Sequence, residues 1–285
     1  MSEQANNGCA ANFGVRLIGC ADDAVLPIGM HDYMEALSRC TLVDKTMFIA
    51  DVLDCDASVM VCCRPEGFGK SMNLSMLKAF LERPAVGRVG RISFADTLIW
   101  DADGGRYRDE YACYPVISLD FSGAARRGAA VVGVVRDALS GECARLMPLL
   151  EAPDLARDKV RHIERVVRGV ASEAEVASVL GVLIELLETA CDEQVVLLVD
   201  GYDAAWLGRS NARGASGADP AGLFDRVLFE AIATARDSLR LTCLMGERPG
   251  PAEAALSSRS CSYCLSTPLS ATVGSAFRMP RSRLC

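Results

Sequence analysis

The most informative stretch of the sequence is SVMVCCRPEGFGKS, residues 58–71. Its first six residues are apolar or small, a composition typical of a short buried strand. The next eight, RPEGFGKS at 64–71, hold two glycines and end in Gly-Lys-Ser. Leu74, Leu77 and Leu81 then recur at helical spacing. The segment is therefore predicted to form a strand, a glycine-containing loop and an amphipathic helix.

The loop at 64–71 carries residue types that suit phosphate binding. Gly69 lets backbone N–H groups turn toward phosphate oxygens, and the positive end of the new helix points to the same place. Lys70 can reach the outer phosphates, and the Ser71 hydroxyl can bind Mg²⁺. The usual spacing places a glycine where this chain has Arg64, so an ordinary turn with a lysine in the first helical turn is the alternative.

Three further apolar runs are predicted to be buried strands, at residues 115–121, 194–200 and 240–245. Helical patterns alternate with them, and Ser172 with Glu175 has the spacing of a capping box. Strands that alternate with amphipathic helices favour a mostly parallel sheet with helices on both faces. Together with the loop at 64–71, they predict an α/β, three-layer P-loop NTPase fold.

Asp200 ends the run at 194–200. Ligands of open α/β sheets bind at the carboxyl ends of the strands, where this carboxylate would supply the second Mg²⁺ contact of a P-loop protein. The alternative is that Asp200 only caps the following turn. We expect the Gly69 loop and Asp200 to lie at the same edge of the sheet, on adjacent strands.

Three weaker features each have a structural interpretation that we favour. Asp44 precedes an apolar helix at 47–53, and it either contacts adenine or, as we favour, starts that helix. Asp120 faces the same edge as Asp200 in a parallel sheet, but a strand-terminal turn residue is the favoured interpretation. The charged run at 157–168 is interpreted as a solvated helix face.

Composition indicates which partners and which cellular location to expect. The 285-residue chain has a net charge of −7, which gives no reason to expect nucleic acid as the main partner. A polar N-terminus and the lack of 18 consecutive apolar residues indicate a cytoplasmic protein without a membrane span. Thirteen cysteines without zinc-ligand spacing are interpreted as small buried apolar residues.

Domain boundaries follow from the same patterns. Residues 1–25 are predicted to be a loosely ordered lead-in and residues 26–249 the P-loop domain. Residues 250–285 are rich in Ser, Pro and Gly and are predicted to be an irregular tail, with one further short strand near 261–265.

The sequence resembles the bacterial AAA-ATPase-like family of predicted ATPases, which are often followed by a restriction-endonuclease-like domain. The resemblance runs from Leu26 to Met245, and it is most specific at residues 68–78. The other matching segments are Leu26-Pro27-Ile28-Gly29, residues 43–49, Arg64-Pro65, Tyr114-Pro115-Val116, Val199-Asp200 and Tyr202-Asp203.

By resemblance, the triphosphate would contact Arg64, Pro65, Gly67, Phe68, Gly69, Lys70, Ser71 and Met72. Ser71 and Asp200 would hold the Mg²⁺ ion. The catalytic set would then comprise Lys70, Asp200, Asp203 and Arg248, the last acting in trans from a neighbouring subunit of a homo-oligomer. The residues indicate no particular nucleic-acid or protein partner.

Several departures from the family fall on catalytic parts. The family shows Asp-Glu-Tyr-Asp where this chain has Asp200-Gly201-Tyr202-Asp203, so the expected general base is absent. Glu66 and Gly67 replace basic residues, and residues 245–248 keep the family's Gly and Arg but not its Thr. The chain ends at Cys285, and we expect the helical lid and the nuclease-like domain to be missing.

These departures lead to one main prediction and two alternatives. The main prediction is a protein that binds Mg²⁺–ATP with weak or absent hydrolysis, because Gly201 has no side chain. The first alternative is an active ATPase that uses Asp203. The second is an interaction module, not dependent on nucleotide, that retains the loop as a relic.

Overall fold

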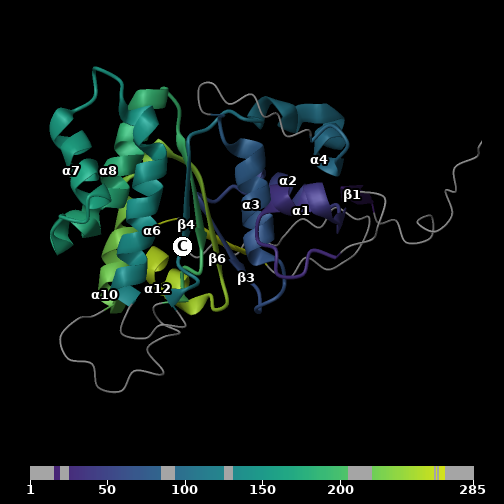
Figure 1. Cartoon of the computed structure of the whole chain (residues 1–285). Helices are drawn as coiled ribbons and strands as arrows, with labels where there is room; N and C mark the ends of the chain where they lie inside the picture. The colour runs from purple at the N-terminus through teal and green to yellow at the C-terminus, as the bar shows by residue number, and fades with distance from the viewer. Residues whose placement is uncertain are drawn as a thin grey trace, which may run out of the picture.

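A computed structural model of the chain describes residues 16–19, 26–84, 94–124, 131–204, 220–259, 261 and 263–266. Its centre is a parallel sheet of five strands in the order β4-β5-β6-β3-β7 (Figure 1). The four predicted strands are confirmed, and their bounds are β3 (Val59–Cys63), β4 (Val116–Asp120), β5 (Val195–Asp200) and β6 (Leu239–Gly246). The fifth is β7 (Tyr263–Ser266).

The Gly69 loop, residues 64–71, is called the phosphate loop below. The expectation that this loop and Asp200 lie on adjacent strands is wrong. β6 lies between β3 and β5, pairing Gly246 with Cys63 on one side and Met245 with Asp200 on the other. All but one residue of β6 are buried, and a strand with buried backbone needs partners at both edges. The two segments nevertheless end at the same edge of the sheet.

One face of the sheet is covered by α3 (Lys70–Leu81), which follows the phosphate loop (Figure 1). Shorter helices pack around it: α1 (Tyr33–Arg39), α2 (Met47–Leu53), α4 (Leu98–Asp101) and the 3-10 segment η1 (Ala102–Glu110). A two-stranded antiparallel sheet of β1 (Leu17–Gly19) and β2 (Thr41–Val43) contacts α1.

The other face is covered mainly by α6 (Val131–Leu146) and α8 (Glu173–Cys191), with α7 (Arg157–Val167) packed against both. A second helical run consists of α10 (Pro220–Phe224), the π-helix η4 (Asp225–Glu230) and α11 (Ala231–Thr234). The remaining elements are η3 (Met147–Leu150), η5 (Arg236–Ser238) and α12 (Gly250–Ser258).

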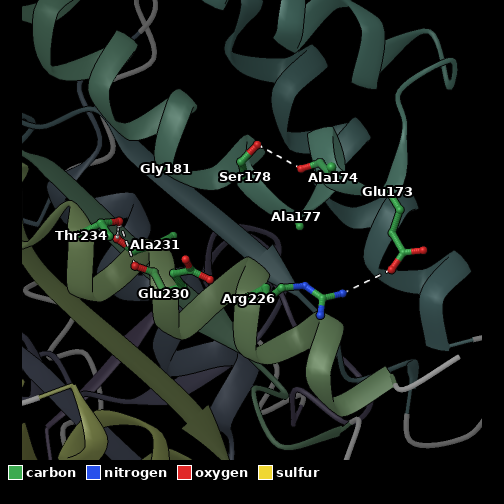
Figure 2. A pocket seen from close by; sticks show the side chains of 9 residues that line it. All are labelled: Glu173, Ala174, Ala177, Ser178, Gly181, Arg226, Glu230, Ala231 and Thr234. Atoms are coloured by element: carbon green, nitrogen blue, oxygen red, sulfur yellow. Dashed lines mark hydrogen bonds and ion pairs between the residues drawn. The ribbon is translucent and has the colours of Figure 1, made fainter.

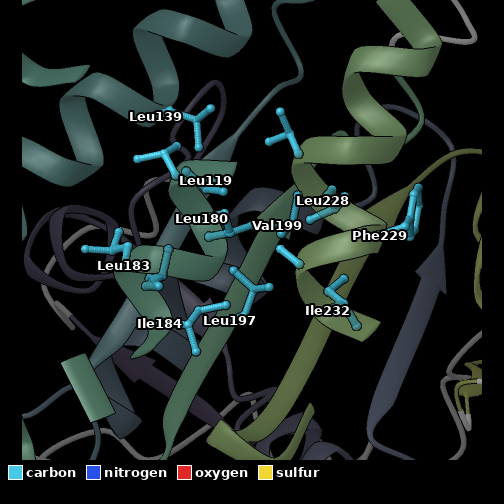
Figure 3. Close-up of a cluster of buried hydrophobic side chains, with 14 of the residues drawn as sticks. Leu119, Leu139, Leu180, Leu183, Ile184, Leu197, Val199, Leu228, Phe229 and Ile232 are labelled. Carbon is cyan, nitrogen blue, oxygen red and sulfur yellow. The ribbon is translucent and has the colours of Figure 1, made fainter. Parts of the chain in front are cut away.

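The hydrophobic core is divided in two by the sheet. Along β5, Leu197 and Val199 belong to the cluster under α6 and α8, whereas Val196 and Leu198 belong to the cluster under α3. Figure 3 shows Leu197 and Val199 facing the side chains of α8 and η4. Alternate residues of a strand point to opposite faces, so the run is apolar throughout because both faces are buried. The three-layer α/β prediction is thus confirmed.

The predicted start of α8 is confirmed, whereas α2 has Thr46 and not the expected Asp44 as its N-cap. Ser172 and Glu175 form the predicted capping box, with Glu175 N–H donating to Ser172 Oγ over 3.3 Å and Ser172 N–H donating to Glu175 Oε2 over 2.7 Å. The helix expected from Leu223 onward contains the π-helix, which its apolar spacing did not predict. Its expected first residue, Asp219, lies outside the described residues.

The ends of the chain are described only in part. Of the predicted lead-in at 1–25, the described residues are 16–19, most of which form β1. Residues 250–285 were predicted to be an irregular tail with one short strand near 261–265. The structure instead begins this region with the helix α12, followed by the strand β7, and the residues after Ser266 lie outside the described ranges. No helix in the described ranges has the length and apolar character needed to span a bilayer.

Candidate functional site

Two glycines set the backbone of the phosphate loop. Gly67 and Gly69 have φ values of 83° and 75°, in the left-handed region that favours glycine. A Cβ atom at either position would meet nothing within 4 Å, so the requirement is for backbone conformation and not for space. Gly69 directly precedes α3, and the exposed loop thereby turns into a helix N-terminus.

The Lys70 side chain folds back over this loop. Its Nζ donates to the carbonyl oxygen of Arg64 over 2.8 Å and to that of Pro65 over 3.0 Å. Both carbonyls belong to the loop, and the N–H of Arg64 donates to the Gly246 carbonyl at the end of β6 over 2.9 Å. A lysine ammonium has three donors, so one remains for a further acceptor at the loop.

The Ser71 hydroxyl donates a hydrogen bond to Oδ2 of Asp200. Ser71 is in the first turn of α3 and Asp200 ends β5, so the contact spans the intervening strand β6. The hydroxyl and carboxylate predicted to share a metal ion thus lie in direct contact. Both are hard oxygen donors, and Mg²⁺ is commonly held by one or two carboxylates together with water and phosphate oxygens.

The charge state of Asp200 depends on several neighbours. Asp200 is 5% exposed, and this burial raises the pKa of its carboxyl above the usual value. The hydrogen bond from Ser71 and the charge of Lys70 lower that pKa, whereas the charge of Asp120 raises it. Asp120 is directly paired with Asp200 in the register of β4 and β5, and its own side chain is exposed. Two carboxylates therefore meet at this edge.

Gly201 directly follows Asp200, at the position where the resemblance led us to expect a glutamate. Its φ is 67°, and an added Cβ would lie 2.6 Å from the backbone nitrogen of Ser122 and 2.9 Å from the carbonyl carbon of Phe121. The turn after β4 fills this space, and the Ser122 N–H donates to Oδ1 of Asp120 over 2.8 Å. The local backbone is therefore built around glycine and has no room for a side chain.

Asp203 is buried, at 1% exposure, and its carboxylate binds backbone amides. Oδ2 accepts from the N–H of Glu247 over 2.9 Å and from that of Arg248 over 2.8 Å. The preceding residue, Tyr202, is also buried, and its hydroxyl donates to the Arg248 carbonyl over 2.5 Å. The sequence suggested a catalytic role for Asp203, but its carboxylate holds the segment after β6.

The other predicted contact residues differ in their surroundings. Arg64 and Met72 are half-buried, and Met72 packs against the core under α3. Phe68 is 62% exposed at the tip of the loop. Arg248 is exposed, and its guanidinium has no ion-pair or hydrogen-bond partner within the described part of the chain. The phosphate loop, Asp200 and the segment bearing Arg248 thus all follow strands that end at one edge of the sheet.

Two residues to which the sequence assigned no role contribute to this edge. Tyr202 joins the end of β5 to Arg248, and its hydroxyl also lies 3.3 Å from Sγ of Cys63 at the end of β3. Only glycine fits at position 246, because a Cβ there would lie 2.6 Å from Asp203 Oδ1 and from Tyr202 Cε1. Gly246, the last residue of β6, was noted in the sequence as part of the resemblance, but its close packing was not predicted.

The Asp44 side chain is buried and forms hydrogen bonds within the protein. Its Oδ1 accepts from the N–H of Thr46 over 2.9 Å at the start of α2, and its Oδ2 accepts from the N–H of Leu98 over 2.7 Å at the start of α4. Both oxygens are therefore engaged in joining two helices. This geometry favours the structural interpretation of Asp44 over a contact with adenine.

A pocket of about 640 Å³ lies between α8 and the run η4–α11 (Figure 2). Small side chains line it, and Arg226 donates to Glu173 across one end over 3.3 Å. None of the predicted phosphate-loop residues contributes to its lining. Among the described residues, no group of three or more His, Cys, Asp or Glu is arranged to hold a metal ion.

Comparison with known proteins gives one match. A family model described as "Predicted AAA-ATPase" (AAA-ATPase_like) matches residues 27–249. No curated protein and no solved structure matches the chain.

Proposed function

This chain belongs to the predicted AAA-ATPase-like family, and on that premise we propose that it binds Mg²⁺–ATP at the edge formed by the phosphate loop and Asp200. Family membership supports nucleotide binding in general. The choice of ATP and of Mg²⁺, and the role of each residue, are our proposal. Within it, hydrolysis is slow or absent.

The observation that carries the proposal is the hydrogen bond from Ser71 to Asp200. These residues come from different elements, and 129 positions separate them in the sequence. A serine hydroxyl after the loop lysine and an aspartate at a strand end form the usual protein share of a P-loop metal site. A buried carboxylate needs a donor in any role, but this donor comes from the serine that directly follows the loop lysine, which supports the metal role of Asp200.

In this site Lys70 would contact the β- and γ-phosphates, using a donor that the loop carbonyls leave available. The backbone N–H groups around Gly69 and the start of α3 would surround the phosphates. Ser71 and Asp200 would hold Mg²⁺, which neutralises charge on the phosphate oxygens when bound. The chain's own residues therefore position and neutralise the triphosphate.

Slow hydrolysis follows from what the protein offers the attacking water. Phosphoryl transfer depends on positioning and charge stabilisation, with a water-orienting residue as a recurring part. Gly201 has no side chain, and Ser122 leaves no space for one. Oδ2 of Asp203 is engaged with two amides. Neither Gly201, where a glutamate was expected, nor Asp203 is therefore well suited to activate water.

Nucleotide binding is tested by titrating a fluorescent ATP analogue, with Mg²⁺ present, into wild type, Lys70→Ala and Lys78→Ala. Lys78 is a matched control, because it lies on the same helix about 12 Å further along its axis. Loss of a charge-assisted contact should weaken binding by roughly 10- to 100-fold in Lys70→Ala. Lys78→Ala should bind as wild type does.

Equal binding by Lys70→Ala and wild type would overturn the proposal. That result would favour the interaction module in which the phosphate loop is a relic. A Ser71→Ala variant adds a second check, because its binding should respond less to Mg²⁺ than wild-type binding does.

A further inference from the structure

β4 is the first strand in the order of the five-stranded sheet, and β5 is its neighbour there. On the edge toward β5, the Phe121 N–H donates to the Asp200 carbonyl over 2.8 Å. The backbone groups of successive residues point to opposite edges of a strand, so those of Val116 and Ser118 point away from β5. An outer edge of this kind is a template for pairing with a strand of another chain.

Glu142 of α6 binds this outer edge. The helix packs beside β4 (Figure 1), and Glu142 Oε1 accepts from the Ser118 N–H over 2.5 Å, where the carbonyl oxygen of a further strand would lie. Glu142 is 7% exposed, and a glutamate is seldom buried to this degree unless it is paired. Arg145 of the same helix supplies the pair, with Nη2 and Nε donating to the two carboxylate oxygens over 2.7 Å and 2.8 Å.

Arg145 also binds the strand itself. Its Nη2 donates to the Val116 carbonyl over 2.6 Å, where the N–H of a further strand would lie. Glu142 thus accepts a hydrogen bond from β4 and Arg145 donates one to it, which are the two kinds of bond that a paired strand makes. Because both side chains are charged, these bonds are stronger than those between neutral groups. The pair therefore takes the place of a further strand along this part of β4.

The segment before β4 is covered by backbone. Glu82, which follows α3, forms an isolated parallel bridge with Tyr114. The Arg83 N–H donates to the Tyr114 carbonyl over 2.8 Å, and the Tyr114 N–H donates to the Leu81 carbonyl over 3.0 Å. Arg145 reaches this segment as well, because its Nη1 donates to the Glu82 carboxylate. The backbone cover and the side-chain cover therefore continue each other along one edge.

We propose that Glu142 and Arg145, called the edge cap, close the outer edge of β4 against a second copy of this chain. Two β4 edges related by a twofold axis could pair in antiparallel fashion and join two sheets into one, because each copy supplies the same strand. The edge cap occupies the donor and the acceptor that such pairing would use. This role goes beyond the proposed function and does not depend on nucleotide.

The test is the molar mass of the full-length chain, measured by size-exclusion chromatography with light scattering over a range of concentrations. Glu142→Ala should form a species with twice the wild-type mass. Arg145→Met keeps an apolar stem and removes the donors, so it should do the same. Asp137→Ala is the matched control, because it removes an exposed carboxylate from the same helix, and it should keep the wild-type mass. Glu142→Gln retains an acceptor oxygen, so it should stay closer to wild type than Glu142→Ala does.

A second substitution identifies the surface that associates. Ser118→Pro removes the N–H that Glu142 binds, and proline is tolerated on edge strands where that N–H points away from the sheet. When it is added to Glu142→Ala, the wild-type mass should return.

Hydrogen exchange of single amides in dilute protein separates opening of the edge from a general loss of stability. In Glu142→Ala the Ser118 amide should exchange roughly 10-fold faster or more, because it loses a charged acceptor. The Phe121 amide, which is bound across to β5, should change far less.

Three results would overturn the edge cap. The first is a wild-type mass for Glu142→Ala at every concentration. The second is continued self-association when Ser118→Pro is added, since another surface would then be responsible. The third is an equal change in exchange at Ser118 and Phe121, or no change at either.

Discussion

A Cβ atom at Gly201 would lie 2.6 Å from the backbone nitrogen of Ser122. The glycine is therefore more than the absence of the glutamate expected by resemblance, because the turn after β4 occupies the space that a side chain would need. Gly201 also has a φ of 67°, which is costly for any residue with a Cβ. Reinstalling a glutamate at this position should therefore fail to create a working base.

The first prediction compares two glycines in the same backbone region. Gly169 has a φ of 71° at the end of α7, where an added Cβ meets nothing within 4 Å. Gly169→Ala should cost only the left-handed strain, about 1–2 kcal/mol. Gly201→Ala should cost about 1–3 kcal/mol more, because the backbone of Ser122 must move. Urea unfolding of both variants measures the difference, and equal losses would contradict the packing argument.

Gly201→Glu extends the same prediction to activity. The variant should be less stable than wild type and should show no gain in phosphate release under saturating Mg²⁺–ATP. Faster release by Gly201→Glu would show that the turn at Ser122 yields and that only a side chain was missing.

The second prediction concerns the pH dependence of metal binding. Burial raises the pKa of Asp200, and the charge of Asp120 also acts to raise it. Mg²⁺ binds the ionised carboxylate, so metal-dependent ATP binding should be present above this raised pKa and lost as the pH falls through it. Asp120→Asn removes the neighbouring charge, and it should therefore shift this loss to lower pH.

The measurement is the pH midpoint of Mg²⁺-stimulated ATP-analogue binding. Asp154→Asn is a suitable control, because it removes an exposed carboxylate that follows η3, outside the phosphate loop and β5. An unchanged midpoint in Asp120→Asn would mean that the two carboxylates do not interact across β4 and β5.

The third prediction concerns Glu66, which is exposed in the phosphate loop where the resemblance led us to expect basic residues. A solvated carboxylate near phosphates is repulsive by on the order of 1 kcal/mol. Glu66→Gln should therefore strengthen ATP binding by up to about fivefold. The gain should shrink as the salt concentration rises, because surface charges are screened. Glu151→Gln removes an exposed charge beside η3 and should change nothing. A gain that is independent of salt would contradict an electrostatic cause.

The sequence predicted the strands well because their apolar runs reflect burial on both faces. It did not predict their order, since the placement of β6 between β3 and β5 depends on long-range pairing that no local pattern encodes. Ser71 and Asp200 were identified because each belongs to a short motif with its own chemistry.

The roles of Asp203 and Gly201 could not be predicted in the same way. The partners of Asp203 are backbone amides 44 and 45 positions away, and an amide carries no sequence signature. Likewise, the neighbour that fills the space at Gly201 is the backbone of Ser122. A residue's type indicates what it can do, but the available partners decide which role it takes.

The last prediction is that wild-type hydrolysis is slow while binding persists. A water-orienting carboxylate is worth about 10²–10⁴ in rate, and neither Gly201 nor Asp203 is placed to supply one. Phosphate release should therefore be as slow as that of an enzyme without a general base.

Asp120 is the remaining carboxylate that we test as a base, because it is paired with Asp200 at the same edge and its side chain is exposed. The measurement is phosphate release by wild type, Asp203→Asn and Asp120→Asn at saturating Mg²⁺–ATP. Brisk release abolished by Asp203→Asn would restore the active ATPase suggested by the sequence, whereas brisk release abolished only by Asp120→Asn would identify the exposed carboxylate of β4 as the base.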